Sequence, residues 1–143
     1  MPEMNPFQPP QAAVADQELA VDIDSLNVSD KWKKKFHWIH KAGGPRMPNL
    51  KQMPKEERRQ FWLFNILAFL FGPFYYLAKG MWRKAISMSL ICFVVLFVVG
   101  IILDALGMAA LDRALGYGVA AVFAIRANID YYKKMVLADN GWW

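Results

Sequence analysis

The strongest pattern in the chain is one long apolar run with polar and aromatic residues on either side. Residues 85–103 read AISMSLICFVVLFVVGIIL, which is 19 positions without a charged residue. At ~1.5 Å rise per residue, a helix of this length reaches roughly 28 Å, about the thickness of the hydrocarbon core of a bilayer. A soluble core helix would show a polar face, so the pattern predicts a membrane-spanning helix.

A second apolar stretch follows at about 108–129, after a predicted turn at 104–108. It is weaker because charged residues interrupt it, and it is rich in glycine and alanine. Small residues at four-residue spacing allow the backbones of two helices to approach closely in lipid. We therefore expect helix packing at Gly116, Gly118 and Ala120, against another helix of the same chain more often than against a second copy.

A third apolar stretch, residues 61–78, is broken at Gly72-Pro73. A helix is predicted to start at Pro54 and to end before this break, because the residue before a proline disfavours helical geometry. The apolar part of that helix has only 11 residues, which is too few to cross a bilayer. We expect residues 61–78 to form a broken helix that re-enters the membrane or lies in its interface, with the break at Gly72 and Pro73.

A basic amphipathic helix is predicted over residues 31–42, where a Gly-Gly-Pro sequence ends it. Trp32, Phe36 and Ile39 form an apolar stripe, and lysines fill most of the remaining surface. One interpretation places this helix on anionic head groups of the inner leaflet; the other packs the stripe on the protein's own helices and leaves the lysines in water. The predicted membrane-surface residues are Lys31, Trp32, Lys33, Lys34, Lys35 and Phe36.

Charge is distributed unevenly along the chain. The first 30 residues contain six acidic residues and no lysine or arginine, whereas residues 31–60 contain ten basic residues and two acidic ones. The acidic segment is too poor in apolar residues to offset its ordering entropy, which predicts disorder. The expected organisation is an acidic tail (1–28), a basic helix and linker (29–60), a broken apolar helix (61–78), a hairpin of two spanning helices (79–135, with spans at about 85–103 and 108–129) and a C-terminal tail (136–143).

The positions of basic residues predict the topology. If residues 61–78 crossed the membrane, the basic residues at 79–84 and 133–134 would lie outside, against the positive-inside rule. If they do not cross, sixteen of the 17 lysines and arginines stay inside. We therefore expect a multi-pass protein of the bacterial inner membrane with both termini in the cytoplasm. The first 30 residues lack the basic start and apolar run of a cleavable signal peptide, so the internal apolar segments should drive insertion.

Candidate chemistry is sparse. His37 and His40 are three residues apart, but no cysteine or further histidine pair accompanies them, so we expect no metal site. Arg126 and Asp130 have the i, i+4 spacing of a helical ion pair. No catalytic set, phosphate loop or nucleic-acid-binding module is recognisable. The sequence therefore predicts no enzyme, no cofactor and no nucleic-acid partner.

Two motifs resemble those of a known family. Residues 65–76 read NILAFLFGPFYY, with Met-Trp at 81–82, and residues 127–134 read ANIDYYKK. Both resemble the hallmark segments of the domain-of-unknown-function 2628 family of small bacterial inner-membrane proteins. The chain departs from that pattern at Ile66 and Tyr75, where the family commonly has tryptophan. The resemblance implies a membrane location and no established activity.

Three functions remain open at this point. The first is a membrane-anchored adaptor or regulator, because an acidic tail and a basic helix precede the hairpin. The second is a small oligomeric, holin-like pore former that assembles through the small-residue face. The third is an accessory subunit of a larger membrane complex. The expected partners are the lipid bilayer, anionic head groups, and another membrane protein or a second copy of the chain.

Overall fold

The computed structural model describes residues 22–60 and 64–143, and these residues form helices and connecting turns without a strand. This confirms the predicted all-helical class. Residues 1–21, most of the predicted acidic tail, lie outside the described part, as do residues 61–63. After a short 3-10 turn at Ile23–Ser25, the helices are α1 (Asp30–Lys41), α2 (Lys55–Gln60), α3 (Ile66–Phe71), α4 (Pro73–Ala78), α5 (Trp82–Ala105) and α6 (Ala109–Val136).

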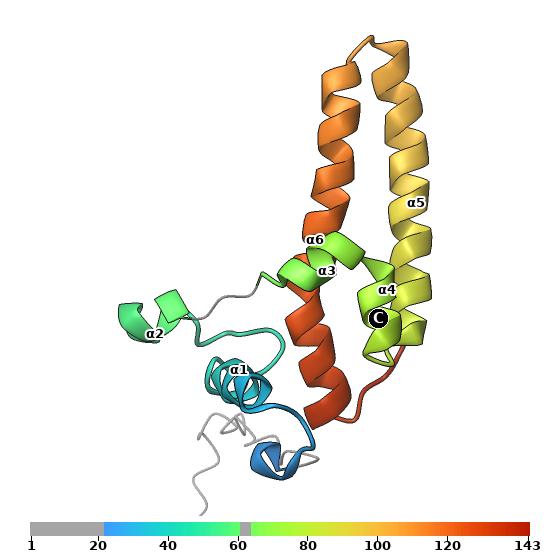
Figure 1. Ribbon diagram of the computed structural model, residues 1–143. Helices are drawn as coiled ribbons and strands as arrows, with labels where there is room; N and C mark the ends of the chain where they lie inside the picture. Colours follow the sequence, from blue (N-terminus) through green and yellow to red (C-terminus); the bar gives the residue numbers. More distant parts are fainter. Residues whose placement is uncertain (1–21, 61–63) are drawn as a thin grey trace, which may run out of the picture.

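Helices α5 and α6 run antiparallel, side by side, and form the long axis of the molecule (Figure 1). The predicted span at 85–103 lies inside α5. Among the described helices, α5 is the one whose length and composition suffice to cross a membrane. The chain turns back at Gly107, which has a φ of +69°, a left-handed conformation that glycine adopts without steric cost. Helix α6 continues seven residues beyond the predicted end at 129.

The segment before the hairpin, residues 54–78, contains three short helices (α2, α3 and α4), one more than the sequence predicts. The expected single helix over 54–71 is wrong, because α2 ends at Gln60 and α3 begins at Ile66. Asn65 has an extended backbone, and its side chain accepts a hydrogen bond from the backbone N–H of Ala68 (3.1 Å). This N-cap satisfies one of the free N–H groups at the start of a helix and so begins a new helix there.

The predicted break at Gly72-Pro73 is confirmed. Gly72 has φ +47° and ψ −121° and separates α3 from α4, and Pro73 is the first residue of α4. The proline lacks an N–H at a position where the helix does not need one. As a result α3 crosses α6 while α4 lies beside α5 (Figure 1).

Helix α1 packs on the C-terminal part of α6. Phe36 and Ile39 are completely buried, and the ring of Trp32 meets that of Tyr131 edge-on at a centroid distance of 4.7 Å. Ile23 is buried in the same core. Ordered packing therefore starts before residue 28, the predicted end of the tail, because Ile23 extends the apolar face that α1 presents to α6.

The C-terminal segment returns from the end of α6 to the start of α5 (Figure 1). The ring of Trp142 packs edge-on against that of Trp82 at 5.6 Å, and the Asn140 side chain donates a hydrogen bond to the carbonyl of Gly80. The predicted tail at 136–143 is thus attached to the helices along its length.

Candidate functional site

A buried asparagine, Asn65, joins the two motifs at the start of α3, where that helix meets α6. The Asn65 amide nitrogen donates hydrogen bonds to the hydroxyl of Tyr75 (2.9 Å) and to the side-chain oxygen of Asn128 (3.1 Å). Its backbone N–H donates to the carbonyl of Ala124 (3.0 Å). Because Asn65 is only 7% exposed, these bonds replace water, which a buried amide requires. The contacts hold the start of α3 at one place on α6.

A second buried group lies between α4, α5 and α6, around the carboxylate of Asp130. The hydroxyl of Tyr76 donates to Asp130 Oδ2 at 3.1 Å. Lys84 Nζ is 3.6 Å from Oδ1, and Arg126 Nε is 3.6 Å from Oδ2. Lys84 and Asp130 are each only 1% exposed. Removing such charges from water is costly, so each charge depends on the other for compensation.

The environment of Tyr76 keeps its hydroxyl protonated. Burial, and then the neighbouring Asp130 carboxylate, raise the pKa of Tyr76 well above its ordinary value. Burial also raises the pKa of Tyr75. Both phenols are therefore neutral hydrogen-bonding groups at physiological pH. In this arrangement Tyr76 stabilises a carboxylate and does not act as a base.

A cavity of about 700 Å³ lies beside this buried group, between the loop after α1 and the C-terminal half of α6. Its charged lining consists of Arg46, Arg126, Asp130 and Lys133. Three of these belong to one face of α6, at the three- and four-residue spacing of a helix. Within the described ranges, Arg46 and Lys133 have no carboxylate partner. The cavity can therefore accept an anionic group.

The predicted membrane-surface residues divide into two sets. Phe36 is completely buried against α6, and Trp32 packs there too, so the stripe serves the protein's own core. Lys31 and Lys34 are exposed. Lys33 donates to the carbonyl of Asp24, and Lys35 lies over the Trp32 ring; burial lowers the pKa of the Lys35 amine. Binding of the exposed lysines to lipid stays a prediction.

The small-residue segment of α6 does not pack as expected within this chain. A Cβ built on Gly116 or Gly118 would meet no atom of a neighbouring element within 4 Å. Helix α5 instead packs on α6 nearer the end of the hairpin that is away from the turn at Gly107, where Met88 and Phe123 join the core and Ala120 is half-buried. The hairpin is therefore held at its base, by large side chains and the polar contacts.

The histidines have other partners. His37 Nε2 lies 2.9 Å from Asp24 Oδ1, and His40 Nδ1 lies 3.3 Å from the Tyr132 hydroxyl. Among the described residues, no group of three or more His, Cys, Asp or Glu side chains is placed to hold a metal ion.

Five residues of these buried contacts belong to the two motifs, whereas Lys84 and Arg126 lie outside them: the motif residues are Asn65, Tyr75, Tyr76, Asn128 and Asp130. The model of a family described as "Protein of unknown function (DUF2628)" matches residues 20–136. The chain belongs to the DUF2628 family. It is 31% identical over 132 residues to "Uncharacterized protein YigF" of Salmonella typhimurium, covering 85% of this chain and 98% of that protein. It is also 31% identical over 123 residues to "Uncharacterized protein YigF" of Escherichia coli K12, covering 81% and 91%. No solved structure matches the chain.

Sequence reasoning missed most of the polar site. The motifs contain Asn65, Tyr76, Asn128 and Asp130, but the pattern assigned a role only to Asp130, as the partner of Arg126. Lys84 was considered only as one of the basic residues at 79–84 that bear on topology. The available signal was the occurrence of asparagine and aspartate inside otherwise apolar helices, which requires a buried partner. The expected Arg126–Asp130 pair is confirmed at 3.6 Å.

Proposed function

We propose that this DUF2628 protein is an integral protein of the bacterial inner membrane and acts as an adaptor or regulator at the cytoplasmic face. The observation that carries the proposal is the exposure of α5. This helix has 24 residues, and only 6% of its most apolar 18-residue window is buried. A core helix of a soluble protein would bury such a surface, whereas an exposed apolar surface of this size requires lipid or a partner.

In the proposed topology, α5 and α6 cross as a hairpin and α3–α4 lie at the cytoplasmic interface. Helices α3 and α4 have six residues each; even end to end they would reach roughly 18 Å, well short of a bilayer core. Their exposed apolar side chains, which include Leu70 at 66% and Phe74 at 72% exposed, suit contact with the bilayer surface. This arrangement keeps sixteen of the 17 lysines and arginines on the cytoplasmic side.

The adaptor role is supported by the packing of α1 on α6. Its apolar face packs on α6. In the proposed topology, the opposite face of α1 presents the exposed lysines Lys31 and Lys34 on the cytoplasmic side. Helix α2 projects to one side of the molecule (Figure 1) and is tied to α1 through the Lys41–Glu57 ion pair at 2.6 Å. These two helices present a charged surface to an acidic partner without any change in the hairpin.

Cysteine labelling tests the topology. In a Cys92→Ala background, single cysteines replace Ala78, Lys51 and Leu106, all of which are exposed. Gly80 is unsuitable, since its φ is +69° and a Cβ would clash with Lys134. With a membrane-impermeant maleimide on intact spheroplasts, we expect labelling at position 106 and protection at 51 and 78 until the membrane is permeabilised. Labelling of position 78 from outside would overturn the proposed topology.

Site-specific photocrosslinking in cells tests the role. A photoreactive amino acid at Lys34 should crosslink to a different protein, whereas one at Leu106 on the opposite end should not. The pore-forming alternative is favoured by the open surface around Gly118, and it predicts crosslinks between copies from that position together with loss of membrane potential on overexpression. Self-crosslinks at 118 with none at 34 would refute the adaptor role.

A further inference from the structure

The cavity beside α6 has more positive charge than its carboxylate balances. Arg46, Arg126 and Lys133 line it, together with Asp130. The Asp130 carboxylate already lies between Lys84 and Arg126 and accepts a hydrogen bond from Tyr76. Two cations of the lining, Arg46 and Lys133, therefore have no anionic partner in the described part of the chain. Guanidinium and ammonium groups converging on one cavity are the usual donors to a phosphate.

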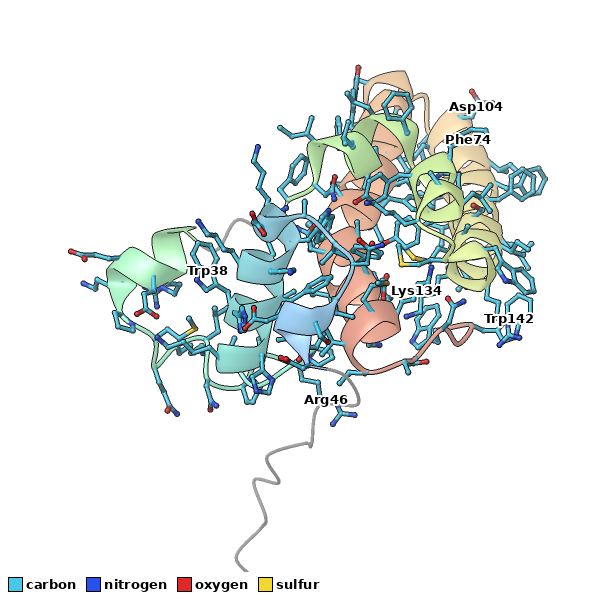
Figure 2. All side chains as sticks on the ribbon, turned by 60° about the horizontal axis from the view of Figure 1, so that its bottom comes forward. Trp38, Arg46, Phe74, Asp104, Lys134 and Trp142 are labelled. Atoms are coloured by element: carbon cyan, nitrogen blue, oxygen red, sulfur yellow. The ribbon has the colours of Figure 1, made fainter. Side chains whose placement is uncertain are left out.

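The position of the cavity connects it to the bilayer surface of the proposed topology, on which this inference rests. The backbone of Asn65 contacts Ala124, so α3 crosses α6 just before Arg126. With α3 in the interface, Arg126 lies at head-group depth, and Lys133 lies roughly 10 Å further into the cytoplasm. Arg46 lies on the opposite side of the molecule from Asp104 at the hairpin tip (Figure 2).

The α6 surface that leads from the cavity toward the hairpin tip is apolar. Val122 precedes Arg126 by one helical turn and is 44% exposed, and Ile125 precedes Ile129 of the cavity lining and is 48% exposed. Gly118 lies one turn further and faces open space. A charged cavity continuous with an exposed apolar track has the two-part chemistry of a phospholipid, with a phosphate at one end and acyl chains at the other.

We propose that this cavity binds the phosphate of an anionic phospholipid, with Arg46, Arg126 and Lys133 as its donors and the acyl chains along Val122 and Ile125. The ligand chemistry is a phosphodiester. A soluble phosphate or phosphate ester would satisfy the same cations, but it would make no use of the apolar track. The site thus differs from a diffuse attraction of the α1 lysines to the leaflet, because it depends on residues that the fold brings together.

The test uses the full-length protein in a nonionic detergent, with phosphatidylglycerol titrated into the micelles and bound lipid counted by native mass spectrometry. The variant Arg46→Gln/Lys133→Gln removes two donors that have no anionic partner among residues 22–60 and 64–143. Arg46→Lys/Lys133→Arg keeps both charges. The matched control, Lys31→Gln/Lys34→Gln, removes the same net charge from the exposed face of α1. Circular dichroism verifies that all variants retain their helix content.

We expect saturable binding of phosphatidylglycerol to the wild-type protein, in preference to phosphatidylcholine. Binding should weaken by about tenfold or more in Arg46→Gln/Lys133→Gln, because two charge-assisted contacts are lost, and should persist in the other two variants. Equal losses in that variant and the α1 control would overturn the proposal in favour of diffuse surface charge. So would equal binding of the two lipids.

A parallel arm separates the two sources of phosphate. The same proteins are titrated with inorganic phosphate and with glycerophosphoglycerol, the head group without its chains. Saturable binding of these soluble ligands without retention of phosphatidylglycerol would overturn the lipid as the ligand and assign the cavity to a soluble phosphate ester. Cysteine labelling reports the topology independently of lipid binding. If labelling agrees with the proposed topology but lipid binding does not depend on Arg46 and Lys133, this inference alone is refuted. If position 78 is labelled from outside, the proposed function is refuted.

Discussion

The buried pair of Lys84 and Asp130 permits a prediction of unequal effects from its two members. Replacing Asp130 by asparagine leaves the Lys84 ammonium buried without its carboxylate. Replacing Lys84 by methionine leaves Asp130 with two of its partners, the Arg126 guanidinium and the Tyr76 hydroxyl. We therefore expect Asp130→Asn to destabilise the fold much more than Lys84→Met does, although each removes one charge of the same pair.

The magnitudes follow from the burial of the two groups. Both side chains are 1% exposed, and breaking a buried pair by removing one partner typically costs about 3–5 kcal/mol. For Asp130→Asn an upper limit is about 5 kcal/mol at pH 7, the cost of taking the proton from an amine that titrates near 10.4 in water. For Lys84→Met we expect about 1–2 kcal/mol, since the remaining carboxylate keeps its other contacts. The double variant should cost about 2 kcal/mol, far less than the sum of the two.

The assay is unfolding of the detergent-solubilised protein by increasing mole fractions of sodium dodecyl sulfate, followed by circular dichroism. Lys34→Met provides the matched control, because Lys34 is exposed and the same substitution there should change stability by less than about 0.5 kcal/mol. Equal and additive losses for the two single variants would refute the argument. That result would mean that Lys84 and Asp130 do not compensate each other in the folded protein.

Other predictions concern the break, the phenol and the docking of α1, and the same unfolding assay tests each of them. Gly72→Ala should destabilise the fold by about 1–3 kcal/mol because the φ of Gly72 is +47°. Gly116 lies inside α6 and a Cβ there would meet no neighbouring atom, so Gly116→Ala should stabilise the fold by up to about 1 kcal/mol. Equal effects of the two substitutions would exclude backbone strain at Gly72 as the cause. Tyr76→Phe should cost about 1–2 kcal/mol through its lost hydrogen bond to the carboxylate. Because the pKa of Tyr76 is raised in the folded state, its contribution is complete below pH 10 and falls as the pH rises beyond that value, so the wild type should lose stability above pH 10 more steeply than Tyr76→Phe. Phe36→Ala should cost about 3–5 kcal/mol and make α1 accessible to protease, an outcome not expected if the stripe binds only lipid.

Several elements could be predicted from local pattern alone. The uncharged run at 85–103 forms a helix, the Gly-Pro pair at 72–73 breaks one, and the amphipathic segment after Ser29 forms α1, because hydrophobic periodicity and backbone restrictions act over a few residues. The cap at Asn65 was missed, since apolar residues on both sides of it read as one continuous helix. The division of α1 between its own core and a membrane surface was also undecided, because an amphipathic face looks the same whichever apolar surface covers it.

By itself the sequence determined the helical class, the long apolar helix, the Gly-Pro break and the strong basic asymmetry, all of which are properties of neighbouring residues. Only the tertiary structure decided where the polar groups go. Asn65 meets Asn128 across 63 residues, and Tyr76 meets Asp130 across 54. Periodicity reports that a helix has an apolar face, but it contains no information on which distant group compensates a buried charge. That choice depends on how α3 and α4 bend at Gly72 and pack on the hairpin, and the same packing places Arg46 and Lys133 around one cavity.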